Sequence, residues 1–253
     1  MPSNRGFLNE EIIAKAIDGK RFIDINHNLQ YTLRAIFPEI SNDDIVEAKQ
    51  LNDIYKPDVS VTYKGITKYI SIKSGHAVEV HSEKARCFAD FLRKHGVSER
   101  TIETFLFFHY GDGTTDGTGT NKLNNYDLMV KYRDRIAEAN EELNKSTKLM
   151  VHVIHHTMFQ GIDPKAKVVD YMYFGNAEYG NIISKHQIRM FLEKKCWKYF
   201  NMLHCGPIFF KPRARYINGP VKSEYRRHMV MCYWPNIAED FCFIGNRYTF
   251  RSN

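Results

Sequence analysis

The sequence has few cysteines and no long apolar run. Its five cysteines are scattered, odd in number and never spaced Cys-x-x-Cys, which disfavours a disulfide framework or a zinc knuckle and favours the reducing cytoplasm. No uncharged apolar stretch is long enough to cross a membrane, and the first residues lack the apolar core of a signal peptide. We therefore expect a cytoplasmic protein with no membrane partner.

Two common catalytic motifs are also missing. There is no Gly-x-x-x-x-Gly-Lys-Ser/Thr motif, so a built-in NTP-driven motor is not expected. The three histidines His152, His155 and His156 do not form the His-Glu-x-x-His motif of a zinc protease, because Val153 and Ile154 occupy the inner positions. We interpret these histidines as core or strand residues rather than metal ligands.

Negative charge is scarce in the C-terminal third. The 253-residue chain has a formal net charge of +7. Residues 185–228 contain eleven Lys and Arg but only two acids, so this segment carries +9 and the remainder −2. A basic segment of this kind is typical of a surface that binds a polyanion.

The most informative stretch that is present is residues 57–75, which has the pattern of a β-hairpin. Apolar and polar residues alternate with a period of two on both sides of Lys64-Gly65, which suits a two-residue turn. That turn places Asp58 directly opposite Ser71, with Cβ atoms about 4.5–5.5 Å apart. Lys73 follows on the same face, so Asp58 and Lys73 can reach a common point.

The rest of the chain predicts a mixed α/β protein. We expect one domain over residues 1–253, with a catalytic core of about 1–175 and a basic, β-rich part of about 176–253. Helices are expected at 9–18, 27–37, 44–50, 82–95, 125–143 and 183–201. Strands are expected at 103–110, 149–156, 168–174, 207–210, 226–233 and 241–244.

With Pro57-Asp58 followed by Ser71-Ile72-Lys73, the chain resembles the PD-(D/E)xK nuclease superfamily, and specifically type II restriction endonucleases with a Ser-x-Lys variant motif. The loop at 110–119 and the basic segments at 206–215 and 226–235 loosely resemble such enzymes too. The resemblance implies a restriction-endonuclease-like mixed β-sheet core flanked by helices. Ser71 stands where a second acid would be expected.

The resemblance also implies an active site that uses Mg²⁺. Asp58 would be the bridging metal ligand, and the backbone carbonyl of Ile72 a further ligand. Lys73 would orient or help deprotonate the attacking water, while Ser71 would hydrogen-bond nearby without binding the metal.

The missing carboxylate would come from the segment after Lys73. Glu83, expected in the first turn of the next helix, is preferred as metal ligand, and Glu79 is the runner-up. Many members of the superfamily add an upstream acid on the first helix, for which Glu11 and Glu47 are both candidates.

The implied activity is sequence-specific, Mg²⁺-dependent cleavage of double-stranded DNA. A homodimer is expected because both strands of a palindrome are cut, and a cognate DNA methyltransferase is the expected genetic partner. Arginines suit guanine readout and lysines suit phosphate contacts. The candidate DNA-binding residues are Arg213, Arg215, Arg226, Arg227, Lys194, Lys195 and Lys198.

Two alternatives remain open. Because of Ser71, the chain could be a non-cleaving DNA-binding protein on a decayed nuclease fold. It could also be a structure-selective repair or recombination nuclease.

Overall fold

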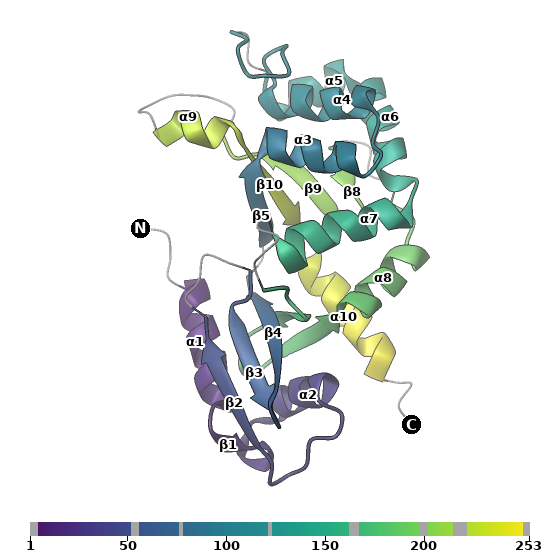
Figure 1. Ribbon diagram of the computed structural model, residues 1–253. Helices are drawn as coiled ribbons and strands as arrows, with labels where there is room; N and C mark the ends of the chain where they lie inside the picture. The colour runs from purple at the N-terminus through teal and green to yellow at the C-terminus, as the bar shows by residue number, and fades with distance from the viewer. Residues whose placement is uncertain are drawn as a thin grey trace. The chain divides into compact units, whose positions relative to one another are not determined.

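A computed structural model describes residues 5–51, 56–75, 78–120, 123–161, 167–197, 202–214 and 222–249 (Figure 1). The chain divides into two compact units. Unit 1 comprises Met1–Val78, Met158–Phe191 and Asn236–Asn253, and unit 2 comprises Glu79–Thr157 and Leu192–Pro235. These boundaries differ from the expected division near residue 175, and the single nuclease domain stays a prediction.

Unit 1 contains a six-stranded mixed sheet in the order β1-β2-β3-β4-β6-β7. Strands β4 and β6 are parallel, and the other neighbouring pairs are antiparallel. The strands are β1 (Lys20–Arg21), β2 (Ile45–Gln50), β3 (Val59–Tyr63), β4 (Ile66–Lys73), β6 (Tyr171–Gly175) and β7 (Gly180–Ser184). The mixed α/β class predicted from the sequence is therefore confirmed.

Helices pack against this sheet and enclose its core. Helix α1 packs on β2, while α2 and α10 pack on β7. The helical segments of this part of the chain are α1 (Arg5–Ile17), the 3-10 turn Phe22–Asp24, α2 (His27–Ile36), α8 (Lys185–Lys194) and α10 (Ile237–Thr249). Helix α2 begins at the cap Asn26, whose side chain accepts a hydrogen bond from the Leu29 amide. The core combines Ile13 and Ile17 of α1 with buried strand residues such as Val59 and Ile70.

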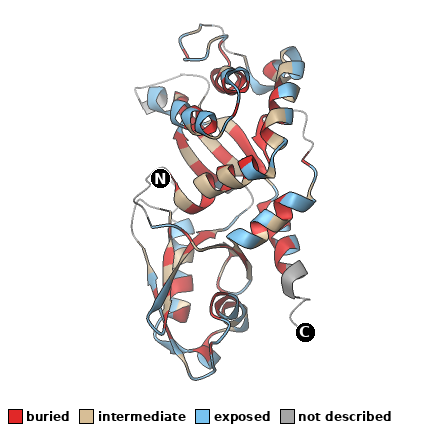
Figure 2. Ribbon diagram, turned by 45° about the vertical axis from the view of Figure 1, so that its right-hand side comes forward, coloured by how far each residue is buried: buried red, intermediate tan, exposed pale blue. Residues whose placement is uncertain are grey.

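Unit 2 is built on a four-stranded sheet in the order β5-β10-β9-β8. Its strands are β5 (Val78–Lys84), β8 (His204–Cys205), β9 (Ile208–Pro212) and β10 (Met229–Trp234). Its helices are α3 (Ala85–Lys94), α4 (Glu99–Tyr110), α5 (Asn125–Lys131), α6 (Arg133–Asn144), α7 (Thr147–Ile154) and α9 (Lys222–Arg227). A π-helix (His155–Gln160) follows α7, and its residues from Met158 onward belong to unit 1. Helix α3 packs on β10 and α4 on β9, and the inward faces of these elements are buried (Figure 2).

The segment 44–50, expected to be a helix, is strand β2 instead. Its residues alternate in burial, with Val46 and Ala48 inside and their neighbours outside, which is the period of a strand. The acidic group expected to cap a helix has another role, because Asp44 accepts hydrogen bonds from the Ser41 amide and the Tyr63 hydroxyl. Pairing with β3 thus outweighs the local capping signal.

Three segments expected to be strands are helices. Residues 103–110 lie in α4, 149–156 in α7 and the π-helix, and 241–244 in α10. Their aromatic and β-branched residues favour strands locally, but their buried residues recur at three- and four-residue spacing, as in Leu149, Met150, Val153 and Ile154. The helical period therefore prevails over local propensity.

The remaining expected elements are present with shifted ends. The helix expected at 125–143 is divided into α5 and α6 at Tyr132, and α8 begins only at Lys185, after strand β7. Residues 198–201, at the end of the helix expected at 183–201, lie outside the described residues. No helix in the described part of the chain has the length and apolarity that a membrane span requires.

Candidate active site

The β3–β4 hairpin has the predicted geometry. Lys64 and Gly65 form its turn with φ angles of 48° and 78°, the left-handed conformation that a tight hairpin turn requires. Tyr63 pairs with Ile66 and Val59 with Ile70, which is the predicted register. Just before β3, Asp58 consequently lies opposite Ser71, and the serine hydroxyl donates a hydrogen bond of 2.8 Å to Asp58 Oδ2.

The described contacts of the Asp58 carboxylate involve one of its two oxygen atoms. Its Oδ2 atom also accepts a 2.5 Å hydrogen bond from the Ile72 amide and lies 3.6 Å from Lys73 Nζ. Among the described residues, the bonded contacts of this carboxylate all fall on Oδ2, which leaves Oδ1 for a further ligand. The structure therefore brings Asp58, Ser71 and Lys73 together.

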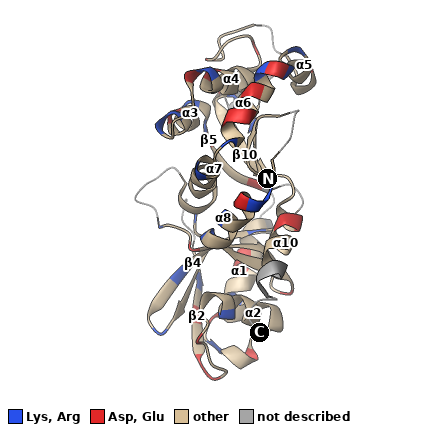
Figure 3. Cartoon of the chain, turned by 90° about the vertical axis from the view of Figure 1, so that its right-hand side faces the viewer, with Lys and Arg blue, Asp and Glu red and all other residues tan. Residues whose placement is uncertain are grey.

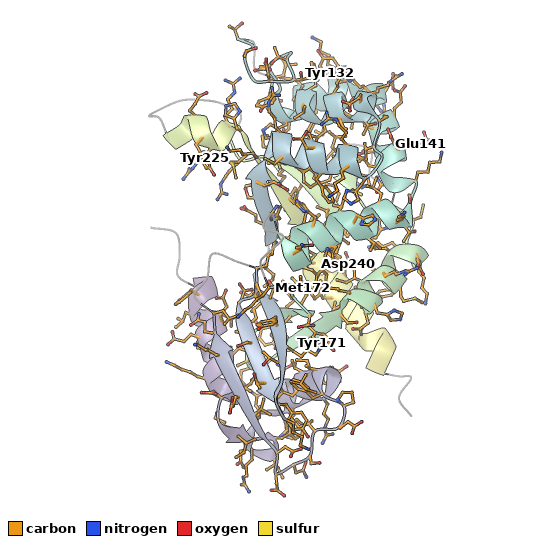
Figure 4. The ribbon with its side chains drawn as sticks, in the orientation of Figure 1. Tyr132, Glu141, Tyr171, Met172, Tyr225 and Asp240 are labelled. Carbon is orange, nitrogen blue, oxygen red and sulfur yellow. The ribbon has the colours of Figure 1, made fainter. Side chains whose placement is uncertain are left out.

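Ser71 is fully buried and belongs to the centre of the sheet. Its exposed fraction is 0%, and its strand neighbour across the parallel β4–β6 pair is Met172, which Figure 4 labels. Lys73 Nζ donates a 3.1 Å hydrogen bond to the Ile72 carbonyl. The predicted metal-binding carbonyl is thus beside Asp58 and in contact with Lys73.

Glu10 on α1 is an acid of this site that the sequence analysis missed. Its pKa is raised from 4.5 to about 7, chiefly by burial and then by the negative charge of Asp58. A hydrogen bond from Gln50 and the positive charge of Lys73 act in the opposite direction. Two carboxyl groups and a lysine therefore influence one another electrostatically at this end of the sheet.

Helical spacing could have identified Glu10. It precedes the buried residues Ile13 and Ile17 by one and two turns and so lies on the inward side of α1. The two upstream acids named from the sequence lie elsewhere. Glu11 forms a 2.6 Å surface ion pair with Lys15, and Glu47 is exposed on β2 opposite Thr62.

Glu79 and Glu83 lie on strand β5, so the expectation that Glu83 begins the next helix is wrong. Helix α3 begins only at Ala85. The β-branched valines around Glu79 favour a strand, and Ser82 anchors it to β10 by a 3.1 Å hydrogen bond to the Val230 carbonyl. Both acids belong to unit 2 and Asp58 to unit 1.

Both of these acids have partners within unit 2. Glu83 is buried and contacts His81 and His156. Glu79 lies 3.4 Å from Arg213. Their predicted role beside Asp58 stays a prediction, and among the described residues of unit 1 Glu10 brings a second carboxylate to this site.

Five of the seven predicted DNA-binding residues lie in the described part of the chain. Arg213, Arg226 and Lys194 are exposed, and Lys195 Nζ lies 4.8 Å from the centre of the Trp197 ring. Arg226 stands on α9 beside the exposed Tyr225, which Figure 4 labels. Arg215 and Lys198 lie outside the described residues.

Arg227 differs from the other cationic residues because it is buried. Its guanidinium donates a 2.5 Å hydrogen bond to Asp112, and only 8% and 0% of the two side chains are exposed. This buried ion pair engages the guanidinium of Arg227, and its role in base readout stays a prediction. Figure 3 shows further basic residues on β4 and α3, so cationic groups are not confined to the C-terminal third.

Comparison of the sequence with models of known protein families finds no match, and comparison with curated proteins finds none either.

Proposed function

We propose that this protein is a sequence-specific, Mg²⁺-dependent endonuclease of the restriction type that hydrolyses phosphodiester bonds in double-stranded DNA. The observation that carries the proposal is the group formed by Asp58, Lys73 and Glu10 at one end of the mixed sheet. The proposal includes a restriction-endonuclease-like fold and the PD-(D/E)xK resemblance carried by Pro57-Asp58 and Ser71-Ile72-Lys73.

The donor set fits the proposed metal. Mg²⁺ prefers oxygen ligands and needs only one or two carboxylates besides water and phosphate. Asp58 Oδ1, the Glu10 carboxylate and the Ile72 carbonyl are oxygen donors of this kind. When bound there, the ion would supply Lewis-acid activation of the phosphate and of a water molecule.

The chain's own residues have separate roles in this mechanism. Ser71 and the Ile72 amide fix the orientation of Asp58 through its Oδ2 atom. Lys73 carries a positive charge next to that carboxylate, where it can orient the attacking water and stabilise negative charge that develops on the phosphate. Glu10 would help to hold the ion as the second carboxylate, and its raised pKa of about 7 belongs to the metal-free site.

The partners follow from the same proposal. Exposed cations such as Arg213, Arg226 and Lys194 would contact DNA, and a homodimer would place two sites on the two strands. A DNA methyltransferase would protect the host sequence. Ser71 supports one further candidate, a DNA-binding protein that no longer cleaves, because a neutral, buried serine replaces the usual acid of the motif.

Incubation of plasmid and phage DNA with Mg²⁺ tests the proposal. The wild type should give discrete fragments, while Asp58→Asn and Lys73→Met should lower the cleavage rate by about 10²–10³-fold, the usual effect of removing one electrostatic stabiliser. Glu11→Gln is the matched control, because Glu11 neighbours Glu10 but forms a surface ion pair. Equal cleavage by wild type and Asp58→Asn would refute the assignment, uniform degradation would indicate a non-specific nuclease, and binding without cleavage would favour the decayed fold.

A further inference from the structure

Unit 2 contains a compact group of potential metal ligands that the proposed nuclease site does not use. His81 and Glu83 lie on β5, and His156 lies on the π-helix that follows α7. One ligand atom from each residue lies within 4.8 Å of the other two. Glu83 Oε1 is 3.1 Å from His81 Nε2 and 2.5 Å from His156 Nε2.

His81 and Glu83 of this group are buried. Glu83 is 1% exposed and His81 9%. A carboxylate beside two imidazole rings is a suitable ligand set for a divalent ion.

The distances suit a small ion with nitrogen and oxygen ligands. A zinc ion bonds His nitrogen and carboxylate oxygen at about 2.0–2.2 Å, which in a tetrahedron separates neighbouring ligand atoms by roughly 3.3 Å. The His81–Glu83 separation is already close to that value, and the His156–Glu83 separation must widen by less than about 1 Å. The two imidazole nitrogens lie within 4.8 Å of one another and must approach by up to about 1.5 Å. Small rotations of side chains on β5 and the π-helix can supply this change.

The surroundings hold His156 in place and leave a route to it. Its ring stacks on Phe91 with centroids 4.2 Å apart and an interplanar angle of 17°. Its side chain is 16% exposed, whereas that of Glu83 is 2% exposed. An ion can therefore enter from the His156 side, and a water molecule can complete the coordination there. Short π-helices frequently lie at functional sites.

We propose that His81, Glu83 and His156 bind one divalent transition-metal ion, best matched by Zn²⁺, with a fourth position open to water. Two imidazole nitrogens and one carboxylate favour such an ion over Mg²⁺, which prefers oxygen ligands. The ion joins β5 to the end of α7 and so stabilises unit 2. This site is separate in its residues from Asp58, Lys73 and Glu10, and it does not depend on the nuclease proposal.

Metal analysis and ion-dependent unfolding test the site in protein without a histidine tag. Purified wild type should bind about one Zn²⁺ per chain, and Zn²⁺ should raise its Tm. Co²⁺ should give a visible absorption band of low-coordinate Co²⁺. His156→Ala should weaken Zn²⁺ binding by at least about 100-fold, because loss of a supporting partner of a ligand already costs 10–100-fold.

His152→Ala is the matched control. His152 lies on α7, one turn before His156 of the π-helix, and its ring contacts that of His95 rather than Glu83. This variant should therefore bind Zn²⁺ like the wild type. Asp58→Asn should also bind Zn²⁺ normally, which separates this test from that of the nuclease site. Absence of Zn²⁺ and Co²⁺ binding by wild type, or equal binding by His156→Ala, would overturn the proposal.

Discussion

Replacement of Glu10 by glutamine should change how the stability of this protein depends on pH. The carboxyl group of Glu10 has its pKa raised from 4.5 to about 7 by burial and by Asp58. The folded state therefore retains a proton on Glu10 between about pH 4.5 and pH 7, whereas the unfolded chain has lost it. Because Glu10 binds more protons in the folded state in this range, its contribution to the free energy of unfolding falls as the pH rises from 4.5 through 7.

The size of the effect follows from the pKa. At 1.36 kcal/mol per pH unit, the change from 4.5 to about 7 corresponds to at most about 3 kcal/mol. Glu10 is only half-buried, and solvent screening reduces the effect to about 1–2 kcal/mol. Glu10→Gln removes the titrating group. The free energy of unfolding of this variant, measured relative to that of the wild type, should therefore rise by about 1–2 kcal/mol as the pH increases from 4.5 to 8.

Urea unfolding from pH 4.5 to pH 8 measures this difference. Glu11→Gln serves as the control, because it loses only a surface ion pair with Lys15 and should show a small, pH-independent change. If Mg²⁺ binds as proposed, added Mg²⁺ should stabilise the wild type above pH 7 more than it stabilises Glu10→Gln, since the ion would neutralise Glu10 and Asp58 together. If the free energies of unfolding of Glu10→Gln and the wild type differed by the same amount at every pH from 4.5 to 8, the raised pKa of Glu10 would be refuted.

Two further predictions concern stability. Arg227→Met should lower the free energy of unfolding by about 3–5 kcal/mol, because Asp112 remains buried and charged without its partner. Urea unfolding should show partial recovery when Asp112→Asn is added, and a loss below about 1 kcal/mol in the single variant would contradict this reasoning. Asn26→Ala should cost about 1 kcal/mol through loss of the α2 cap, whereas Asn26→Ser should retain most of that stability in the same assay; equal losses would argue against the cap.

Local patterns in the sequence determined the hairpin and its register. The period of two and the Lys64-Gly65 turn fix which residues face each other, so the contact between Asp58 and Ser71 follows from chain geometry alone. Lys73, two residues further on, necessarily lies near the same end. The mixed α/β class was predictable for the same reason, because the alternating and helical periods are local properties.

Local propensity failed where a segment's partners lie far away in the sequence. Residues 44–50 look like a capped helix, but β3 supplies the strand partner that makes them β2. The aromatic run at 103–110 looks like a strand, but packing against α3, α6 and β9 makes it α4. In both cases tertiary contacts outweigh a preference of a few tenths of a kcal/mol per residue.

Only the tertiary structure decided which acids gather with which partners. The sequence offered Glu11 and Glu47 as upstream companions for Asp58, whereas the inward side of α1 brings in Glu10. The same folding places Glu83 between His81 and His156, although His156 follows 73 residues later and looked like a core residue. The sequence specifies a hairpin because neighbouring residues define it. A site that joins a helix or a distant strand to that hairpin depends on tertiary packing, which the local spacing of residues does not determine.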